Sequence, residues 1–225
     1  MTFSLVGRDA ATGMLGAVVS SSSPAVAARC AHVRPGVGAA ASQNVTDPSL
    51  GTRMLDLMAT GQTASEAVAA VTAGEQHIGF RQLTAVDAAG GTGSFSGDRT
   101  LGANASAEGD GAVAAGNLLA STGVPEAMLA AFAASAGEHL AERLVRALEA
   151  GLAEGGEEGP VRSAGLVVCD RVSWAIADLR VDWHDEPIPA LRALWEVWQP
   201  QMDDYVTRAL DPSAAPSYGV PGDEA

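Results

Sequence analysis

Hydrophobic and polar residues alternate at the start of the chain with a period of two, which is typical of β-strands. Phe3 and Leu5 alternate with Thr2 and Ser4, and the alternation resumes over residues 15–19. The segment between these two runs, residues 9–13 (DAATG), has the composition of a turn. The sequence therefore predicts a β-hairpin at the N-terminus.

Further along the chain, apolar residues recur at helical spacing in several segments. These predicted helices cover residues 49–60 and 63–73, begin again at Pro125, continue through 139–152 and finish with 187–210. Thr63 and Glu66 have the spacing of a capping box at the start of the second segment. The first four segments are expected to form two antiparallel helical pairs, each covering a sheet.

The last helical segment carries an apolar stripe made of Leu191, Leu194, Trp195 and Trp198. Pro200 is expected to kink or split this helix, because proline cannot donate the backbone hydrogen bond of a helix interior. The two tryptophans are expected in the core or in a dimer interface. From this apolar helix we predict a homodimer or a higher homo-oligomer.

Short strands are predicted between and after the helices, at residues 36–43, 80–86, 93–97, 101–107, 111–118, 164–169 and 174–181. The first of them, GVGAAASQ, has little side-chain volume. This composition fits close approach by a neighbouring backbone or a ligand, and it equally fits simple close packing. Residues 25–31 are expected to form a short helix or a loop.

The order of these elements predicts the fold class. Strands, a helical pair, more strands, a second helical pair, two strands and a helix favour an α+β sandwich over a parallel α/β fold, which would need alternating strands and helices. In that sandwich, two antiparallel sheets lie between helical layers. We expect a single domain over residues 1–210, followed by an extended or disordered tail over 211–225.

Composition narrows the choice of partners and of cellular compartment. The formal net charge is −14, which disfavours binding to nucleic acid or to an anionic membrane. No apolar run reaches the roughly 20 residues of a membrane span, and no secretory signal opens the sequence. Cys30 and Cys169 are isolated, as in proteins of a reducing compartment. These features predict a cytoplasmic protein.

The glycine-rich segment 154–160 is expected to be a linker whose three glutamates, Glu154, Glu157 and Glu158, are solvated. Arg180 and Asp182 are expected to form a structural ion pair. The histidines lack the spacing of a zinc site, and no nucleotide-binding motif or GxSxG elbow is present. The sequence therefore predicts no metal and no cofactor.

The second residue of the chain, Thr2, offers two reactive groups for catalysis. Methionine aminopeptidases remove Met1 when the next side chain is small, so the mature chain is expected to begin with Thr2. Its hydroxyl is a weak nucleophile, but an α-amine with a pKa of about 7.7 to 8 can serve as the base on the same residue. The alternative interpretation is that Met-Thr is simply a common way for a protein to begin.

Several stretches resemble one family, and they occur in that family's order: MTFSLVGRD, GVGAAASQN, RQLTAVDAAG, AAGNLLAS, PEAMLAAFAAS and DLRVDWHDEPIPALRALWE. By these stretches the chain resembles the domain-of-unknown-function 1028 family (DUF1028), which is grouped with the N-terminal nucleophile (Ntn) hydrolases. The resemblance implies a four-layer αββα sandwich and acyl-transfer chemistry. It does not imply a particular substrate.

In Ntn hydrolases, backbone amides or an asparagine side chain stabilise the oxyanion. Asn117, at the end of a predicted strand and preceded by the small Gly116, is the candidate donor. The alternative is a turn asparagine that caps the next element.

Four further residues at predicted strand ends are candidates for substrate binding. Gln43 and Asn44 are expected beside Thr2, in a sheet whose first three strands are neighbours, and Ser22 and Ser23 are expected to hydrogen-bond the free amine. For each of these four, the alternative is strand-end capping. Arg81 is a candidate for binding a substrate carboxylate.

The function predicted from these residues is hydrolysis of a small polar amide or lactam by an Ntn-type amidohydrolase, with Thr2 as nucleophile. The alternative is a non-catalytic small-molecule-binding or assembly protein on the same fold, which would keep Met1. Relatives that carry an added peptidoglycan-binding segment suggest a cell-wall amide as a third reading, against which the sequence shows neither a secretion signal nor a wall-binding module.

Overall fold

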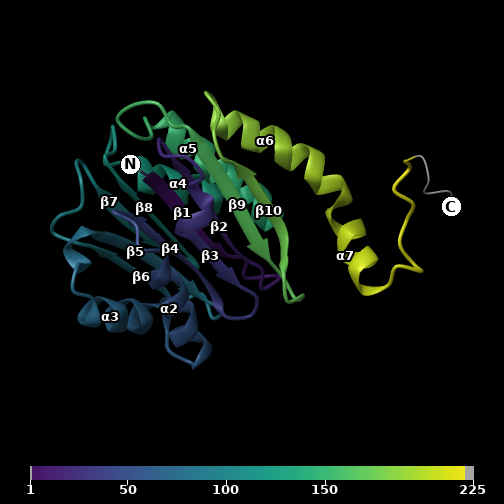
Figure 1. The fold of residues 1–225 in the computed structure, drawn as a ribbon, viewed down its shortest axis with the longest axis horizontal. Coiled ribbons are helices and arrows are strands. Elements are labelled where there is room, and N and C mark those ends of the chain that lie inside the picture. Colours follow the sequence, from purple (N-terminus) through teal and green to yellow (C-terminus); the bar gives the residue numbers. More distant parts are fainter. Residues whose placement is uncertain (1, 221–225) are drawn as a thin grey trace.

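The computed structural model describes residues 2–220 and contains two antiparallel β-sheets, seen in Figure 1. A six-stranded sheet has the order β10-β9-β2-β1-β8-β7, and a four-stranded sheet has the order β3-β4-β5-β6. The strands are β1 (Thr2–Arg8), β2 (Leu15–Ser21), β3 (Ala31–Arg34), β4 (Gly38–Asn44), β5 (Arg81–Asp87), β6 (Thr92–Ser96), β7 (Ala105–Gly109), β8 (Ala112–Asn117), β9 (Ser163–Cys169) and β10 (Ala175–Val181).

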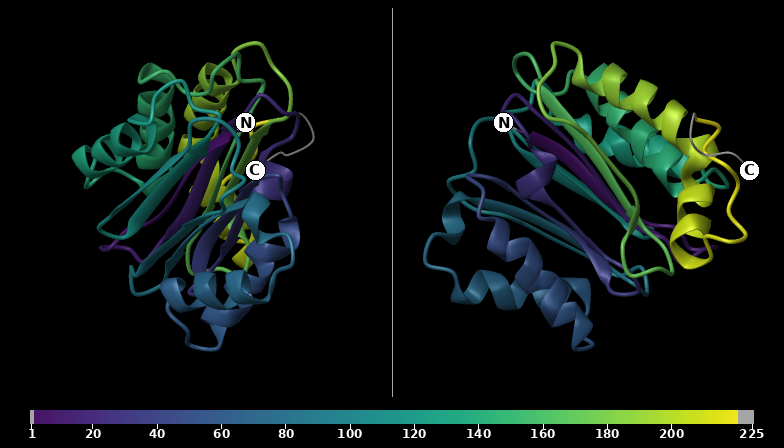
Figure 2. Two further views of the ribbon diagram at one scale, coloured as in Figure 1. Left: turned by 90° about the vertical axis from the view of Figure 1, so that its left-hand side faces the viewer. Right: turned by 45° about the vertical axis from the view of Figure 1, so that its right-hand side comes forward.

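Helices cover the outer face of each sheet, as the side views in Figure 2 show. The four-stranded sheet is covered by α2 and α3, and the six-stranded sheet by α4, α5 and α6. The helices are α1 (Ala27–Cys30), α2 (Pro48–Ala59), α3 (Ala64–Gly74), α4 (Val124–Ala134), α5 (Leu140–Ala153), α6 (Pro187–Trp198) and α7 (Met202–Leu210). This arrangement confirms the predicted α+β sandwich of two antiparallel sheets between helical layers.

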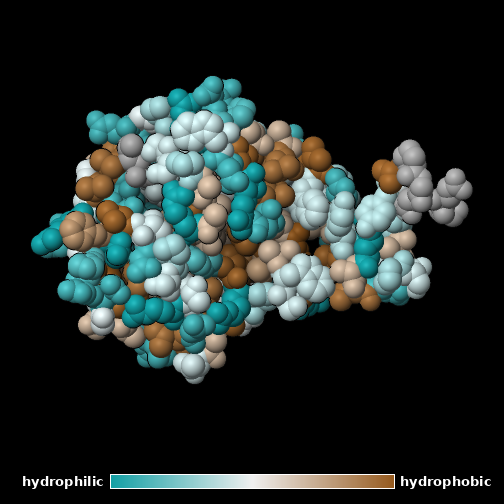
Figure 3. Space-filling view, viewed as in Figure 1, coloured by the Kyte–Doolittle hydropathy of each residue, from teal (hydrophilic) through white to brown (hydrophobic). Residues whose placement is uncertain are grey.

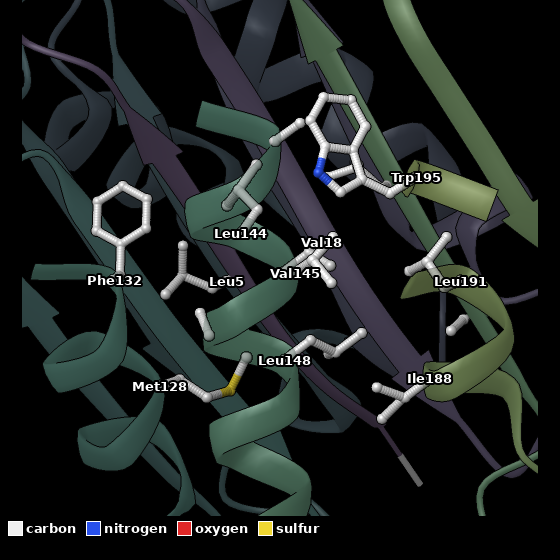
Figure 4. Packing of buried hydrophobic residues seen from close by; sticks show 14 of the residues in the cluster. Leu5, Val18, Met128, Phe132, Leu144, Val145, Leu148, Ile188, Leu191 and Trp195 are labelled. Carbon is white, nitrogen blue, oxygen red and sulfur yellow. The ribbon is translucent and has the colours of Figure 1, made fainter. Parts of the chain in front are cut away.

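The largest apolar core lies between the six-stranded sheet and its helices (Figure 4). Phe3 and Leu5 of β1 project into it, and Trp195 of α6 is fully buried in the same cluster. Because side chains alternate along a strand, Thr2 and Ser4 face the opposite way, towards the four-stranded sheet. The N-terminal strand is therefore anchored by its apolar face and presents hydroxyls between the sheets.

Local sequence signals at two helix boundaries are confirmed. The Thr63 hydroxyl accepts a hydrogen bond from the backbone N–H of Glu66, and the Glu66 carboxylate accepts one from the backbone N–H of Thr63, which completes the predicted capping box of α3. The final helix is split by a short 3-10 turn at Gln199–Gln201, which contains Pro200. Proline thus divides the segment into α6 and α7 as expected.

The predicted apolar stripe of α6 needs one correction. Leu191 and Trp195 are fully buried, and Trp198 donates a 3.0 Å hydrogen bond from its indole Nε1 to the Ile176 carbonyl. Leu194, in contrast, is 36% exposed. It stands one residue before Trp195, so a helical turn of about 100° per residue rotates it away from the sheet.

Two strands differ from the sequence prediction. Residues 31–34 form β3, an edge strand that was not predicted because its four residues, AHVR, show no apolar run. The strand predicted from residue 101 begins instead at Ala105. Gly102 has a φ of +59°, and a Cβ at this position would lie 2.5 Å from the Leu118 side chain, so this part of the chain turns instead of extending.

The strand of small residues, β4, owes its composition to close packing between layers. A Cβ on Gly38 would lie 2.6 Å from the Val86 carbonyl oxygen of β5 and 2.8 Å from the Met58 methyl of α2. Ala39 and Ala41 are buried in the inter-sheet cluster that also contains Val6 of β1. Of the two interpretations left open by the sequence, these contacts favour simple close packing, because the backbone of β5 and side chains of α2 and β1 fill the space next to the strand.

Helical structure ends at Leu210, and turns without a helix or strand follow through residue 220. The remainder of the predicted tail, residues 221–225, lies outside the described residues. Hydrophilic and hydrophobic patches are interspersed on the face drawn in Figure 3. Among residues 2–220, no helix combines the length and the apolar character that a membrane crossing requires.

Candidate active site

Thr2 begins β1, an interior strand of the six-stranded sheet, and has polar neighbours on both sides. In the antiparallel register Thr2 lies opposite Asn117 of β8. On the other side its hydroxyl Oγ1 donates to Ser21 Oγ of β2 at 3.4 Å. Thr2 is 4% exposed, and Asn117 and Ser21 are fully buried. The start of the chain is thus held inside the sheet, with hydroxyl and amide groups beside it.

A chain of amide side chains crosses from the six-stranded sheet to the four-stranded sheet below this point. Ser4 Oγ donates to Gln43 Oε1 at 2.7 Å, and Gln43 Nε2 donates to Gln82 Oε1 at 2.8 Å. Asn117 Nδ2 donates to the same Gln82 oxygen at 3.0 Å. All four side chains are at most 1% exposed. Since buried amides are costly when unpaired, this network fixes how each of them points.

Gln82 holds the network together. Its Oε1 accepts from Gln43 and Asn117. Its Nε2 donates to the Gly116 carbonyl and to Ser96 Oγ, each at 3.0 Å. The orientation of Asn117 follows, with Nδ2 towards Gln82 and Oδ1 buried without a hydrogen-bond partner among the described residues. A carboxamide has two N–H groups, so one donor of Asn117 remains beyond the bond to Gln82.

Gln43 lies near the candidate site for a different reason from the one predicted. The sequence prediction placed the first three strands side by side in one sheet, and this is wrong, because β3 and β4 belong to the four-stranded sheet. Gln43 instead reaches Ser4 across the space between the sheets. The chain passes from β2 in the six-stranded sheet to β3 in the four-stranded sheet through α1, and no strong sequence pattern predicts this connection.

Asn44 and Arg81 make contacts that hold the end of β4. Asn44 has a φ of +75°, donates from Nδ2 to the Phe80 carbonyl at 2.6 Å, and accepts at Oδ1 from the backbone N–H of Leu101 at 3.2 Å. Arg81, opposite Asn44 in the register, donates from its guanidinium to the Val45 carbonyl. Their observed partners are therefore backbone groups of neighbouring loops.

Ser22 and Ser23 follow β2 directly and lie next to the Thr2 end of the sheet. The backbone N–H of Ser22 donates to Glu157 Oε1 at 2.8 Å, and that of Ser23 donates to Ser21 Oγ at 3.1 Å. The Ser23 carbonyl accepts from Ser163 Oγ of β9 at 2.6 Å. These bonds shape the turn beside Thr2 and bring a carboxylate to it.

The carboxylate of Glu157 corrects the prediction that all three glutamates of the linker are solvated. Glu154 and Glu158 are exposed, but Glu157 is only 3% exposed. Burial raises its pKa, and hydrogen bonding from Ser22 opposes that rise. The polar, glycine-rich sequence around it gave no signal of this burial, which arises only where the segment meets the ends of β2 and β8.

The expected pair between Arg180 and Asp182 is also corrected. Arg180 Nε donates to Asp178 at 2.7 Å, within β10. Residues two apart on a strand share one face, so Asp178 is favourably placed, whereas Asp182 lies beyond the strand end at Val181. Within residues 2–220, no three histidine, cysteine or acidic side chains gather into a group that could hold a metal ion.

Comparison with known proteins identifies the family. The model of a family of unknown function, DUF1028, matches residues 2–191. The chain therefore belongs to DUF1028. A crystal structure of a DUF1028 protein from Silicibacter pomeroyi is 30% identical, with a TM-score of 0.83, and the match covers 92% of this chain and 93% of that one.

Two structures of Anbu, an ancestral β-subunit, share less with this chain. The protein from Yersinia bercovieri is 12% identical with a TM-score of 0.39, over 90% of this chain and 97% of that one. A Gly-1 mutant from Hyphomicrobium sp. strain MC1 is 13% identical with a TM-score of 0.40, and the match covers 92% of this chain and 99% of that one. Likeness at this level carries no argument about function. No curated protein sequence matched the chain.

Proposed function

We propose that this protein is an Ntn-type hydrolase that cleaves the C–N bond of a small polar amide or lactam, with Thr2 as nucleophile after removal of Met1. One observation carries the proposal: the Thr2 hydroxyl lies at the start of an interior strand, opposite Asn117 and beside Ser21, facing the polar layer between the sheets. A threonine at the second position would, once Met1 is removed, carry its amine and hydroxyl on the same residue.

In the proposed reaction, the α-amine of Thr2 takes the proton of Oγ1 while Oγ1 attacks the carbonyl carbon of the substrate. The C–N bond then breaks, and the departing nitrogen receives that proton from the α-ammonium. Water hydrolyses the resulting ester, with the amine again serving as base, and Thr2 is regenerated. Thr2 is thus nucleophile, base and acid in turn.

Asn117 is proposed as the oxyanion donor. One N–H of its Nδ2 donates to Gln82 Oε1, and the second N–H can donate to the negative oxygen of the tetrahedral intermediate. Because Gln82 is itself held by Gln43, Gly116 and Ser96, this donor is preorganised. Its neighbour in the network, Gln43, is proposed to contact the polar part of the substrate together with Ser22 and Ser23.

Asn44 and Arg81 are also proposed to bind substrate, but each would first have to break a hydrogen bond to the backbone. Arg81 would have to release the Val45 carbonyl, and Asn44 would have to release Phe80 or Leu101, before either could engage a ligand. Substitution of these residues is therefore expected to change the stability of the loops as well as substrate affinity.

The test is a panel of small amides and lactams assayed with wild type, Thr2→Ala and Thr2→Ser. Alanine and serine also permit removal of Met1, so these variants change the nucleophile without blocking maturation. Thr2→Ala is expected to lose hydrolysis by at least about a thousandfold, and Thr2→Ser to retain it. Thr122→Ala, which alters an exposed threonine, is the matched control. Equal activity of wild type and Thr2→Ala would overturn the proposal.

A non-catalytic binding or assembly protein is the second candidate, and the low exposure of Thr2, 4%, favours it. This candidate predicts that Met1 is retained and that no amide is cleaved. Periodate distinguishes the two on the protein itself, because it oxidises the neighbouring amine and hydroxyl of an N-terminal threonine to an aldehyde. Aldehyde formation by wild type and its absence in Thr2→Ala support the hydrolase.

A further inference from the structure

The N-terminal end of β1 is spanned by a segment that comes from far along the chain. Strand β1 lies between β2 and β8 in the sheet. β1 begins at Thr2, and its two antiparallel neighbours finish at the same end of the sheet. Glu157 forms an isolated antiparallel bridge with Leu119, and Glu158 donates its backbone N–H to the Leu118 carbonyl at 2.8 Å. Because Leu118 and Leu119 directly follow β8, the backbone of Glu157 is fixed on the β8 side of β1.

The side chain of Glu157 reaches the opposite side of the same strand. Its Oε1 accepts the backbone N–H of Ser22 at 2.8 Å, and Ser22 directly follows β2. Neighbouring strands are about 4.8 Å apart, so β2 and β8 are separated by roughly twice that distance, with β1 between them. The carboxylate of Glu157 therefore crosses in front of the end of β1, where the backbone nitrogen of Thr2 lies.

The second oxygen of this carboxylate has no hydrogen-bond partner among residues 2–220. Glu157 is 3% exposed, and its Oε2 is buried without a hydrogen bond from any residue that the structure describes. A buried carboxylate is costly unless a donor or a positive charge meets it. The unpaired oxygen is thus a ready acceptor at the strand end.

The charged and titratable side chains of the segments next to this end of the sheet are engaged elsewhere, exposed or neutral, whereas the positive charge of the chain's N-terminus lowers the pKa of Glu157. Arg162 pairs with Asp185, and Arg29 donates to the backbone carbonyls of two residues just before α1. Glu154 accepts from Ser121 Oγ, and Glu158 is exposed. Burial raises the pKa of the Cys30 thiol, which stays protonated at neutral pH. The segments after β2 and β8 bring serines and leucines to this edge.

On the basis of the proposed function, we propose that Glu157 binds the α-amino group of mature Thr2 and orients its lone pair towards Oγ1. Glu157 is then a positioning residue, in the role that a carboxylate has towards histidine in a Ser-His-Asp triad. When the Oγ1 proton moves to the amine during attack, the carboxylate stabilises the ammonium that forms. The proton returns to the leaving nitrogen, and Glu157 itself neither gains nor loses one.

The composition of the chain makes this pairing measurable. The sequence contains thirteen arginines and no lysine, so the α-amine is its single amine nitrogen. In uniformly ¹⁵N-labelled protein this nitrogen resonates apart from amides and guanidinium groups. A pH titration of its chemical shift therefore gives the pKa of the N-terminal amine directly, without a substrate and without access for a reagent. Intact mass, measured on the same sample, shows whether that amine belongs to Thr2 or to Met1.

The comparison is between wild type, Glu157→Gln and Glu158→Gln. A carboxylate within a few ångströms raises the pKa of an amine by about one unit or more, so Glu157→Gln is expected to lower the midpoint by about that amount. Glu158→Gln makes the same change in charge at the exposed neighbouring residue and is expected to leave the midpoint unchanged. If Glu157→Gln does not fold, the wild-type midpoint decides: a value above the usual 7.7 to 8 supports the pairing, and a value within or below that range overturns it.

The outcomes separate this inference from the function on which it rests. Loss of Met1 together with equal midpoints in wild type and Glu157→Gln overturns the role of Glu157 and leaves the hydrolase proposal standing. Retention of Met1 overturns both. Loss of Met1 with a lowered midpoint only in Glu157→Gln supports the pairing.

Discussion

Asn117 of β8 donates a 3.0 Å hydrogen bond from Nδ2 to Gln82 Oε1 of β5, which ties the six-stranded sheet to the four-stranded sheet beside Thr2. The space between the sheets changes character along the strands. At the other end it is filled by Val6, Leu15 and Val86, and here it is filled by hydrogen-bonded amides. The polar layer is thus built by one face of the strands, at the end where the chain begins.

Gln82 is expected to be the residue of this network whose loss costs most stability. Gln82→Met keeps the volume but leaves the amide donors of Gln43 and Asn117 and the Gly116 carbonyl without their partner. We expect the free energy of unfolding to fall by about 1 to 3 kcal/mol or more, measured by urea denaturation. Gln76→Met, at an exposed position, is the control. Equal losses in the two variants would mean that the network does not stabilise the fold.

Asn117→Ala is expected to reduce turnover by about a hundredfold to a thousandfold on any amide that the wild type hydrolyses, because it removes the proposed oxyanion donor. Asn104→Ala alters an asparagine whose amide donates to the Gly102 carbonyl in a loop, and it is expected to keep wild-type turnover. Circular dichroism establishes that both variants are folded. Wild-type turnover in folded Asn117→Ala would remove this residue from the mechanism.

Gly38→Ala tests the close packing of β4 against its neighbours. A Cβ at this position would meet the Val86 carbonyl at 2.6 Å, and a backbone atom cannot move aside as a side chain can. We expect a loss of stability of about 1 to 3 kcal/mol. In Gly74→Ala, at the end of α3, the nearest atom to the new Cβ lies at 3.9 Å, so this control is expected to be neutral or stabilising. A neutral Gly38→Ala would contradict the packing argument.

Asp9 and Arg143 form a buried ion pair, with 3.0 Å between their side chains, beyond the opposite end of β1 from Thr2. Burial raises the pKa of Asp9, but hydrogen bonds from Thr12 and Ala11 and the Arg143 charge outweigh it, so the pKa is lowered overall. Because the folded state has the lower pKa, the pair stabilises the fold above the unfolded value of about 3.9. That contribution is lost as the pH falls through the folded pKa.

Asp9→Asn is therefore expected to cost about 1.5 to 3 kcal/mol at pH 7 and progressively less in acid. Thermal unfolding of wild type and variant between pH 7 and pH 3 measures this difference. Asp56→Asn breaks an exposed pair with Arg34 and is expected to have little effect at any pH. A difference between wild type and Asp9→Asn that does not change with pH would contradict the assignment.

The sequence predicted those features that depend on local chemistry. The alternation of Phe3 and Leu5 with Thr2 and Ser4 is enough to predict a strand and to separate its two faces. The Thr63–Glu66 capping box and the break at Pro200 likewise depend on neighbouring residues. The strand β3 could not be predicted in this way, because its four residues have neither an apolar run nor a turn signal.

The candidate site was predictable only in part, because its geometry depends on contacts between distant segments. Gln43 was predicted beside Thr2 from its place at the end of a strand, but Gln82 was not predicted as a site residue. The bond between the two amides depends on the two-sheet topology. Glu157 lies in a glycine-rich segment that is typical of a solvated linker. Its burial follows from backbone bonds to Leu118 and Leu119, which no local pattern encodes.

The central claim is that Thr2 becomes the first residue of the mature protein. Intact-mass spectrometry of the purified wild-type chain tests it most directly, since the measured mass distinguishes a chain that begins at Thr2 from one that begins at Met1. We predict a single species whose mass lacks that of Met1, so that the α-amine and the hydroxyl of Thr2 are both uncovered. A purified protein that retains Met1 throughout would contradict it.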